Sequence, residues 1–320
     1  MSDFIHLYTK SKYSLLESCI SIKELVLLAN YFGMEYLALT DTSTLKGVPE
    51  FLEICRENGV KPLIGCEFSV MHYYHKDYSI EEMNPEGADQ IVLFARNTVG
   101  YRSLVNLQNR ADQRMGSASH PYLFLDELES FKNGLYIMVL THTGTIGTFL
   151  NQGKYHEAKY RIEKYLSIFP KYLAISHCDL LKPIALVRLK YTIQLSGELE
   201  VPLAAVNCVQ AIDEYDANEI DKYINLLRST EKIDYFPQMN GWTERFFKGF
   251  KEMKKLFGRF TWLLAETNYI AETIYFNPFK YRLHHYKDPE YEKIHIPLPP
   301  ETNNKRKIEF YKWPEQDEEE

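Results

Sequence analysis

The chain has 320 residues, of which 45% are apolar and 25% are charged, a mix that is typical of a globular protein rather than a disordered or fibrous one. Its 37 lysines and arginines stand against 44 aspartates and glutamates, which gives a formal net charge of −7. An acidic balance argues against a dedicated nucleic-acid coat, although it leaves room for a local basic patch.

Membrane and secreted classes are excluded by the apolar pattern and the cysteines. No apolar run reaches the roughly 18–20 residues that span a bilayer, and the chain does not start with a secretory signal. The five cysteines are scattered, odd in number and free of C-x-x-C spacing, which favours reduced thiols and gives no indication of a zinc knuckle. We therefore expect a cytoplasmic protein.

The first third of the chain repeats one unit, a short apolar strand followed by an amphipathic helix. Ser21 and Glu24 form a capping-box pattern at the start of the first helix, and Gly33 follows its last apolar residue. A second helix is expected to end at Asn58 and Gly59. The predicted strands of this part cover 4–7, 36–39 and 61–67, and the predicted helices cover 22–32 and 45–58.

The same unit recurs with looser spacing up to about residue 206. Further strands are predicted at 91–94, 135–140, 172–175 and 203–206, with helices around 101–109, 145–152, 155–168 and 181–195. Alternating strands and helices predict a parallel sheet with helices packed outside it. Seven or so units suit a closed or nearly closed barrel, so the fold class is α/β, a distorted (β/α)7-type barrel with parallel strands.

The remainder of the chain is predicted to be helical and then extended. We expect the barrel over about 1–215 and a helical region over about 216–278, with helices at 216–228, 251–257 and 260–271. Residues 279–320 are rich in tyrosine, proline and charge and end in an acidic run, which predicts an extended arm with an acidic tail.

Polar residues gather where the predicted strands end, the edge at which barrels of this kind carry their chemistry. Two carboxylates and several histidines at one barrel mouth are suited to a metal site. The alternative is structural, because an Asp or Glu at a strand end often caps the next helix or loop. The residues concerned are His6, Tyr8, Lys10, Asp41, Thr42, Glu67, His142, His177, Asn207, Cys208 and Gln210.

Four stretches resemble a known family, the polymerase-and-histidinol-phosphatase (PHP) domain, in the version found at the N-terminus of the alpha subunit of bacterial DNA polymerase III. They are His6–Glu17, Ala38–Asp41, Gly59–Glu67 and Asn97–Leu104. With weaker likeness further on, the resemblance covers about residues 4–278, so 1–278 would be the PHP domain. It implies a distorted β/α barrel, in agreement with the count of strands and helices.

The resemblance also identifies where the chain departs from active family members, which use zinc, manganese or iron to hydrolyse phosphoesters. The family's opening His-x-His falls on Tyr8 and Lys10, its Asp-His falls on Asp41 and Thr42, and its glutamate is kept as Glu67. The late Asp-x-His falls on Cys208 and Gln210, and Glu17 stands where an acidic residue is usual. These eight residues form a predicted vestigial PHP site, with no catalytic residue and no bound cofactor expected.

Lys10 is the most telling departure, because an ammonium repels divalent ions. We hypothesise that Lys10 replaces the lost metal charge and neutralises Asp41, Glu67 or Glu17. The alternative is that Lys10 points into solvent.

The resemblance implies a non-catalytic module that supports DNA replication by scaffolding the polymerase body, the proofreading exonuclease or both. The palm carboxylates of the polymerase lie beyond the matching segment, so the chain is expected to be an excised domain or a split, stand-alone relative. The alternative is a metal-dependent phosphoesterase or 3′–5′ exonuclease with a re-invented ligand set. Its candidate ligands are Asp41, Glu67, His6, His142 and His177. A third reading is a regulator that occupies a replication partner.

Two further clusters suggest contacts outside the barrel mouth. Lys248, Lys251, Lys254, Lys255 and Arg259 crowd a short helical region that is predicted either to touch DNA phosphates or to form an ordinary solvated face. His284 and His285, in the predicted arm, could form a metal or nucleic-acid patch, but they are expected to be solvated surface.

Overall fold

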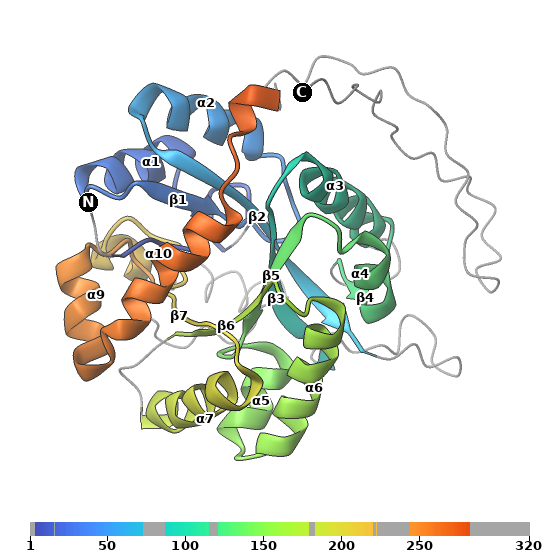
Figure 1. Ribbon diagram of the computed structural model, residues 1–320. Coiled ribbons are helices and arrows are strands. Elements are labelled where there is room, and N and C mark those ends of the chain that lie inside the picture. The colour runs from blue at the N-terminus through green and yellow to red at the C-terminus, as the bar shows by residue number, and fades with distance from the viewer. Residues whose placement is uncertain are drawn as a thin grey trace.

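The computed structural model in Figure 1 describes residues 4–15, 17–72, 87–114, 121–178, 183–219, 222 and 244–281. The predicted arm beyond residue 281, including His284 and His285, lies outside the described residues, as does most of the helix predicted at 216–228.

Local sequence signals place the first two helices. The predicted capping box is present at the start of α1 (Ile22–Tyr31), where the Glu24 amide donates to Ser21 Oγ at 3.2 Å and the Ser21 amide donates to Glu24 Oε2 at 2.9 Å. Helix α2 (Val48–Asn58) begins later than predicted, with Pro49 in its first turn, and ends at Gly59, which has φ of 70°.

The strands form one curled, seven-stranded sheet in the order β1-β2-β3-β5-β6-β7, with β4 beside β2 (Figure 1). This confirms the predicted α/β barrel-like class. The strands are β1 (Tyr36–Leu39), β2 (Lys61–Met71), β3 (Asp89–Ala95), β4 (Leu123–Phe124), β5 (Leu135–Leu140), β6 (Leu173–His177) and β7 (Leu203–Ala205).

The prediction that all strands are parallel is wrong for β3, which runs antiparallel to both β2 and β5. The other pairings, β1–β2, β2–β4, β5–β6 and β6–β7, are parallel. Parallel neighbours need a crossover segment, usually a helix, and the sequence analysis found no helical pattern between β2 and β3. The lack of a predicted helix between them agrees with the antiparallel pairing of β2 and β3.

Helices cover the outer face of the sheet. An outer apolar core lies between the sheet and these helices, and an inner one lies inside the barrel. The covering helices after α2 are α3 (Thr98–Gln113), α4 (Leu125–Phe131), α5 (Gly144–Asn151), α6 (Tyr155–Ile168) and α7 (Pro183–Leu199). Along β2, Ile64 and Phe68 belong to the outer core, whereas Leu63 belongs to the inner one. Since side chains alternate along a strand, Glu67 lies on the same side as Leu63, toward the barrel interior.

The N-terminal segment, which was predicted to be a strand over 4–7, is extended but pairs as an isolated bridge at Thr9 rather than as a regular strand. It lies between β1 and residues 206–210, because Ala38 N donates to His6 O and Lys10 N donates to Val209 O. This placement joins the two ends of the curled sheet and carries Tyr8 and Lys10 to the barrel mouth.

The C-terminal helices close the opposite end of the barrel. They are α9 (Phe250–Phe257), η2 (Gly258–Phe260), α10 (Trp262–Ile274) and η3 (Pro278–Tyr281). Ile270 and Ile274 of α10 pack in the inner core with Tyr36 and Tyr136, which stand at the beginnings of β1 and β5. Among the described residues no helix is long and apolar enough to cross a membrane.

Candidate functional site

The polar cluster at the barrel mouth is built from three segments: the N-terminal segment with the loop after it, the residues that follow β1, and the middle of β2. Tyr8 and Lys10 lie two residues apart in an extended stretch, so their side chains leave on the same side. Thr42 pairs with Glu67 in a parallel bridge, which extends the contact between β1 and β2. Glu67 therefore lies inside β2, not at its end as predicted.

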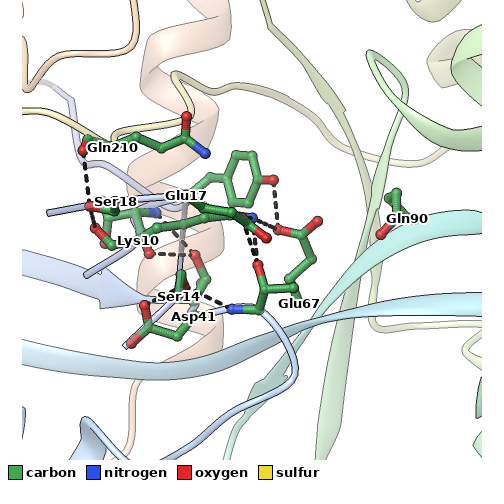
Figure 2. A network of polar contacts seen from close by, with 12 residues as sticks. Lys10, Ser14, Glu17, Ser18, Asp41, Glu67, Gln90 and Gln210 are labelled. Carbon is green, nitrogen blue, oxygen red and sulfur yellow. Dashed lines mark hydrogen bonds and ion pairs between the residues drawn. The ribbon is translucent and has the colours of Figure 1, made fainter. Parts of the chain in front are cut away.

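Lys10 occupies the centre of this cluster (Figure 2). Its ammonium forms ion pairs with Glu17 Oε2 and, at 2.7 Å, with Glu67 Oε2, and it donates to Thr42 Oγ1 at 2.6 Å. The Tyr8 hydroxyl donates to the same Glu67 oxygen at 2.7 Å, and Thr42 Oγ1 donates to Glu17 Oε2 at 2.9 Å. Lys10 is 3% exposed, so the alternative of a solvent-facing lysine is wrong.

The charges of this cluster are coupled, because one ammonium faces two carboxylates. Burial by itself lowers the pKa of Lys10, but Glu17 and Glu67 outweigh burial and raise that pKa above its ordinary value. The pKa of Glu67 is raised by burial and by the Glu17 carboxylate, against the opposing effect of Lys10. Burial and the neighbouring carboxylate also raise the pKa of Tyr8, which keeps its hydroxyl protonated as a donor.

Asp41 has a different role, in line with the structural alternative for a strand-end carboxylate. Its Oδ1 accepts from the Ser11 amide and from Ser14 Oγ, both at 2.7 Å, and its Oδ2 accepts from Ser11 Oγ at 2.8 Å. Burial raises the pKa of Asp41, and these three hydrogen bonds oppose the rise. Asp41 thus fixes the loop that carries Glu17. The sequence analysis missed Ser11 and Ser14, although serines close to an acidic strand end are a usual capping signal.

The last two positions of the predicted vestigial site lie beside the N-terminal segment, because Lys10 N donates to Val209 O between them. Gln210 Oε1 accepts from Arg245 Nη1 at 2.6 Å, and its main-chain oxygen accepts from Ser18 Oγ at 2.9 Å. Cys208 is buried, and burial raises the pKa of its thiol, so the sulfur is kept as a thiol rather than a thiolate. Arg245 was not predicted, because it lies beyond the barrel and reaches the mouth only through folding.

Among the described residues, the three histidines proposed as alternative ligands belong to no group of three or more side chains that could hold a metal ion. The ring of His6 packs against Phe4 and Phe247, and its Nε2 donates to Lys248 O at 2.8 Å. His177 Nδ1 lies 3.5 Å from Thr192 Oγ1, and the ring of His142 lies 5.8 Å from that of Tyr8. Burial lowers the pKa of both His6 and His177 to about 3, which keeps them neutral.

The donor chemistry of the mouth does not fit the metal cluster of active family members. A cluster of divalent ions needs several anionic or imidazole ligands around each ion. Here the two nearest carboxylates, Glu17 and Glu67, are both taken by an ammonium, which offers no lone pair. Across the described ranges, no group of three or more His, Cys, Asp or Glu side chains is arranged to hold a metal ion.

Comparisons with known proteins find similarity to the PHP domain and to DNA polymerase III alpha subunits. Residues 6–177 match the family model of the PHP domain. The chain is 30% identical over 274 residues to the DNA polymerase III subunit alpha of Treponema pallidum, covering 84% of this chain and 23% of that protein. It is 28% identical over 273 residues to the corresponding subunit of Borreliella burgdorferi, covering 85% and 24%. The chain spans about a quarter of the length of these relatives.

A search of solved structures finds an amidohydrolase from Chromobacterium violaceum with a TM-score of 0.45 and 13% identity, covering 65% of this chain and 87% of that chain.

Proposed function

Because the chain belongs to the PHP domain family, we propose that it is a non-catalytic PHP module that serves a replicative DNA polymerase. It is homologous to the N-terminal region of DNA polymerase III alpha subunits. In this proposal the module scaffolds the polymerase body, the proofreading exonuclease or both, and it does so in the cytoplasm. The five cysteines, all within the described ranges, form no disulfide, which suits a reducing compartment.

The observation that carries this proposal is the ion-paired ammonium of Lys10. It lies between Glu17 and Glu67, which map to acidic positions of the family pattern, and with Tyr8 it replaces the family's opening His-x-His. An ammonium with two carboxylate partners neutralises the charge that a metal ion would otherwise neutralise. The ammonium cannot lower the pKa of a bound water molecule for attack on phosphorus, as a metal ion does in active family members.

The alternative function, a metal-dependent phosphoesterase or 3′–5′ exonuclease with a new ligand set, is favoured by one observation. Within the described part of the chain, nothing bonds to Nε2 of the buried His177, so this nitrogen offers a lone pair. A single imidazole is far short of a metal cluster. The two functions nevertheless differ in measurable ways.

Metal content and hydrolysis distinguish the two functions. The full chain is incubated with Zn²⁺, Mn²⁺ or Fe²⁺, desalted and analysed by inductively coupled plasma mass spectrometry, and a phosphodiester substrate is then assayed. We expect no stoichiometric metal and no hydrolysis. We also expect Lys10→His to gain metal affinity, while the matched control Lys12→His, which replaces an exposed lysine, does not. Stoichiometric metal together with hydrolysis in the unmodified chain would establish the enzyme instead.

The scaffolding role is tested by co-purification from native cells. The tagged full chain is captured and the retained proteins are identified by mass spectrometry. We expect a C-family polymerase body or a proofreading exonuclease in stoichiometric amounts. Recovery of a replication protein outside these two classes would favour the regulator, and recovery of no replication protein would contradict the scaffold.

A further inference from the structure

Helix α9 presents a basic face to solvent. Lys251, Lys254 and Lys255 are exposed and occupy positions i, i+3 and i+4, so their side chains leave on one side of the helix. Arg259, also exposed, follows in η2 one turn later. The opposite side, with Met253 and Phe257, is buried in the core. We call Lys251, Lys254, Lys255 and Arg259 the α9 basic face.

Lys248, which was grouped with these residues in the sequence analysis, does not belong to this face. Its side chain is 3% exposed, and its ammonium pairs with Glu244 Oε2 at 3.0 Å. Burial lowers the pKa of Lys248, and the Glu244 carboxylate opposes this effect. Lys248 is therefore a structural residue at the beginning of α9.

The α9 basic face gathers four positive charges in a short segment of the chain. None of its four cations forms an ion pair with a described residue, whereas many other lysines and arginines of the chain do. Glu252 is the one acidic residue between Phe250 and Arg259, and its Oε2 accepts from the Gly249 amide at 2.8 Å. A chain of net charge −7 thus concentrates on a few helical turns four positive charges that have no ion-pair partner among the described residues.

Exposed aromatic rings stand at both ends of this face. Trp262 begins α10 three residues after Arg259 and is 47% exposed. Tyr31, which is 83% exposed, packs edge-on against Phe32, and Phe32 stacks on Phe247 just before α9. Figure 1 shows α9 beside α10, with α1 on the same side of the molecule. Tyr269, two turns along α10 from Trp262, is 60% exposed.

We propose that the α9 basic face, with Tyr31 and Trp262, is a binding site for single-stranded nucleic acid. The four cations would neutralise phosphates of one strand, and the flanking rings would stack on unpaired bases. Regularly spaced cations between exposed aromatic rings are the usual combination in proteins that hold single strands without reading their sequence. An acidic protein segment would also pair with the cations, but it would offer the flanking aromatic rings no bases on which to stack.

Fluorescence anisotropy with a labelled oligothymidylate measures this binding on the full chain. Four neutralised phosphates predict a salt slope of about −2.8, so affinity should fall about fifty-fold between roughly 50 and 200 mM salt. The triple variant Lys251→Gln, Lys254→Gln, Lys255→Gln should reduce the slope by about 2 and weaken binding at low salt by at least about tenfold. Glutamine keeps the helix propensity of lysine, so the fold should persist.

A matched control removes the same amount of charge elsewhere. Lys23, Lys46 and Lys190 are exposed lysines at separate places on the surface, and their triple replacement by glutamine lowers the net charge equally. We expect this control to bind oligothymidylate with an affinity within about twofold of that of the unmodified chain, because only cations that contact the bound strand neutralise its phosphates. Equal loss in both triple variants would contradict a site on α9, as would the absence of binding at low salt.

The aromatic rings distinguish nucleic acid from an acidic protein. Trp262→Ala should weaken oligothymidylate binding about tenfold with little change in the salt slope, since base stacking carries no counterion release. A duplex of equal length should compete poorly. Polyglutamate that competes as well as the oligonucleotide, or a Trp262→Ala variant that binds normally, would overturn the assignment and favour an acidic protein partner.

Discussion

Two buried clusters in this molecule differ in the ratio of acidic to basic groups. At the barrel mouth, the single cation Lys10 faces the carboxylates of Glu17 and Glu67. On the outer side of the sheet, the carboxylate of Asp89 faces Arg161 Nη1 at 3.2 Å and His72 Nε2 at 2.5 Å. In each cluster a tyrosine hydroxyl donates to the carboxylate, Tyr8 in the first and Tyr165 in the second.

The difference bears on the proposal that the Lys10 cluster is a vestigial PHP site and the Asp89 cluster part of the framework. The Asp89 cluster joins the start of β3 to α6 and balances its charge with ordinary partners. The Lys10 cluster has more carboxylates than cations, an arrangement that is costly to bury and that a metal site would normally require. Under the function proposed above, this composition is that of a former metal site in which the ammonium of Lys10 replaces the metal charge.

The largest effect is expected for removal of the central cation. Lys10→Met leaves Glu17 and Glu67 facing each other in a buried site, and the free energy of unfolding should fall by about 3–5 kcal/mol. Chemical denaturation at neutral pH measures this loss. Lys12→Met, which breaks only an exposed pair with Glu50, should cost less than about 1 kcal/mol. Adding Glu67→Gln to Lys10→Met should recover part of the stability, and a further loss would contradict the repulsion.

Removal of the central anion in the other cluster should cost less. Asp89→Asn leaves Arg161 unpaired, but this side chain is 15% exposed and can turn toward water, so we expect a loss of about 2–3 kcal/mol. The same denaturation measurement applies. If Asp89→Asn cost more than Lys10→Met, the proposed contrast between a charge-balanced cluster and one with excess carboxylates would fail.

Acid should destabilise the barrel interior through its buried histidines. The pKa of His6 and of His177 is lowered from 6.5 to about 3, so below pH 6.5 the unfolded chain binds protons that the folded chain does not. Stability should therefore fall as pH falls from 6.5 toward 3, by about 2 kcal/mol for each histidine at pH 5. Chemical denaturation at pH 7.5 and pH 5 measures this loss of stability. Because the two histidines contribute equally, His177→Gln should remove about half of the loss that they cause together.

The two tyrosines provide the smallest and most closely matched comparison. Tyr8→Phe and Tyr165→Phe each delete one hydroxyl that donates to a buried carboxylate. The hydrogen bond of Tyr8 measures 2.7 Å and that of Tyr165 measures 3.1 Å. We expect losses of about 2 and about 1 kcal/mol, because the shorter bond serves the cluster with excess negative charge. Thermal unfolding of both variants decides the order, which would be reversed if the Asp89 cluster were the more strained.

Most local elements of the fold follow from the sequence. The capping box at Ser21, the glycine stop at Gly59 and the limits of β1 and β5 are found where the pattern predicted them. These features depend on neighbouring residues, and neighbours in the chain stay neighbours after folding. The family resemblance was confirmed for the same reason, since its motifs are short and continuous.

The candidate site was predicted less completely. Its members Tyr8, Lys10 and Glu67 were identified from the family pattern, and Lys10 was expected to have a carboxylate partner. The sequence left three partners open, and the structure selects Glu17 and Glu67 while Asp41 binds Ser11 and Ser14. Side-chain partnerships of this kind depend on distances between separate segments, about which spacing along the chain carries no information.

By itself, the sequence determined the α/β class, the family and most of the strands and helices, although not β4 and α4, because these features depend on residue type and local periodicity. Only the tertiary structure decided that β3 runs antiparallel, that Lys10 is buried between two carboxylates, and that Lys248 is internal while Lys251, Lys254 and Lys255 face solvent. These outcomes depend on which distant segments pack together. Packing depends on contacts among all the core residues together, and no local sequence pattern specifies it.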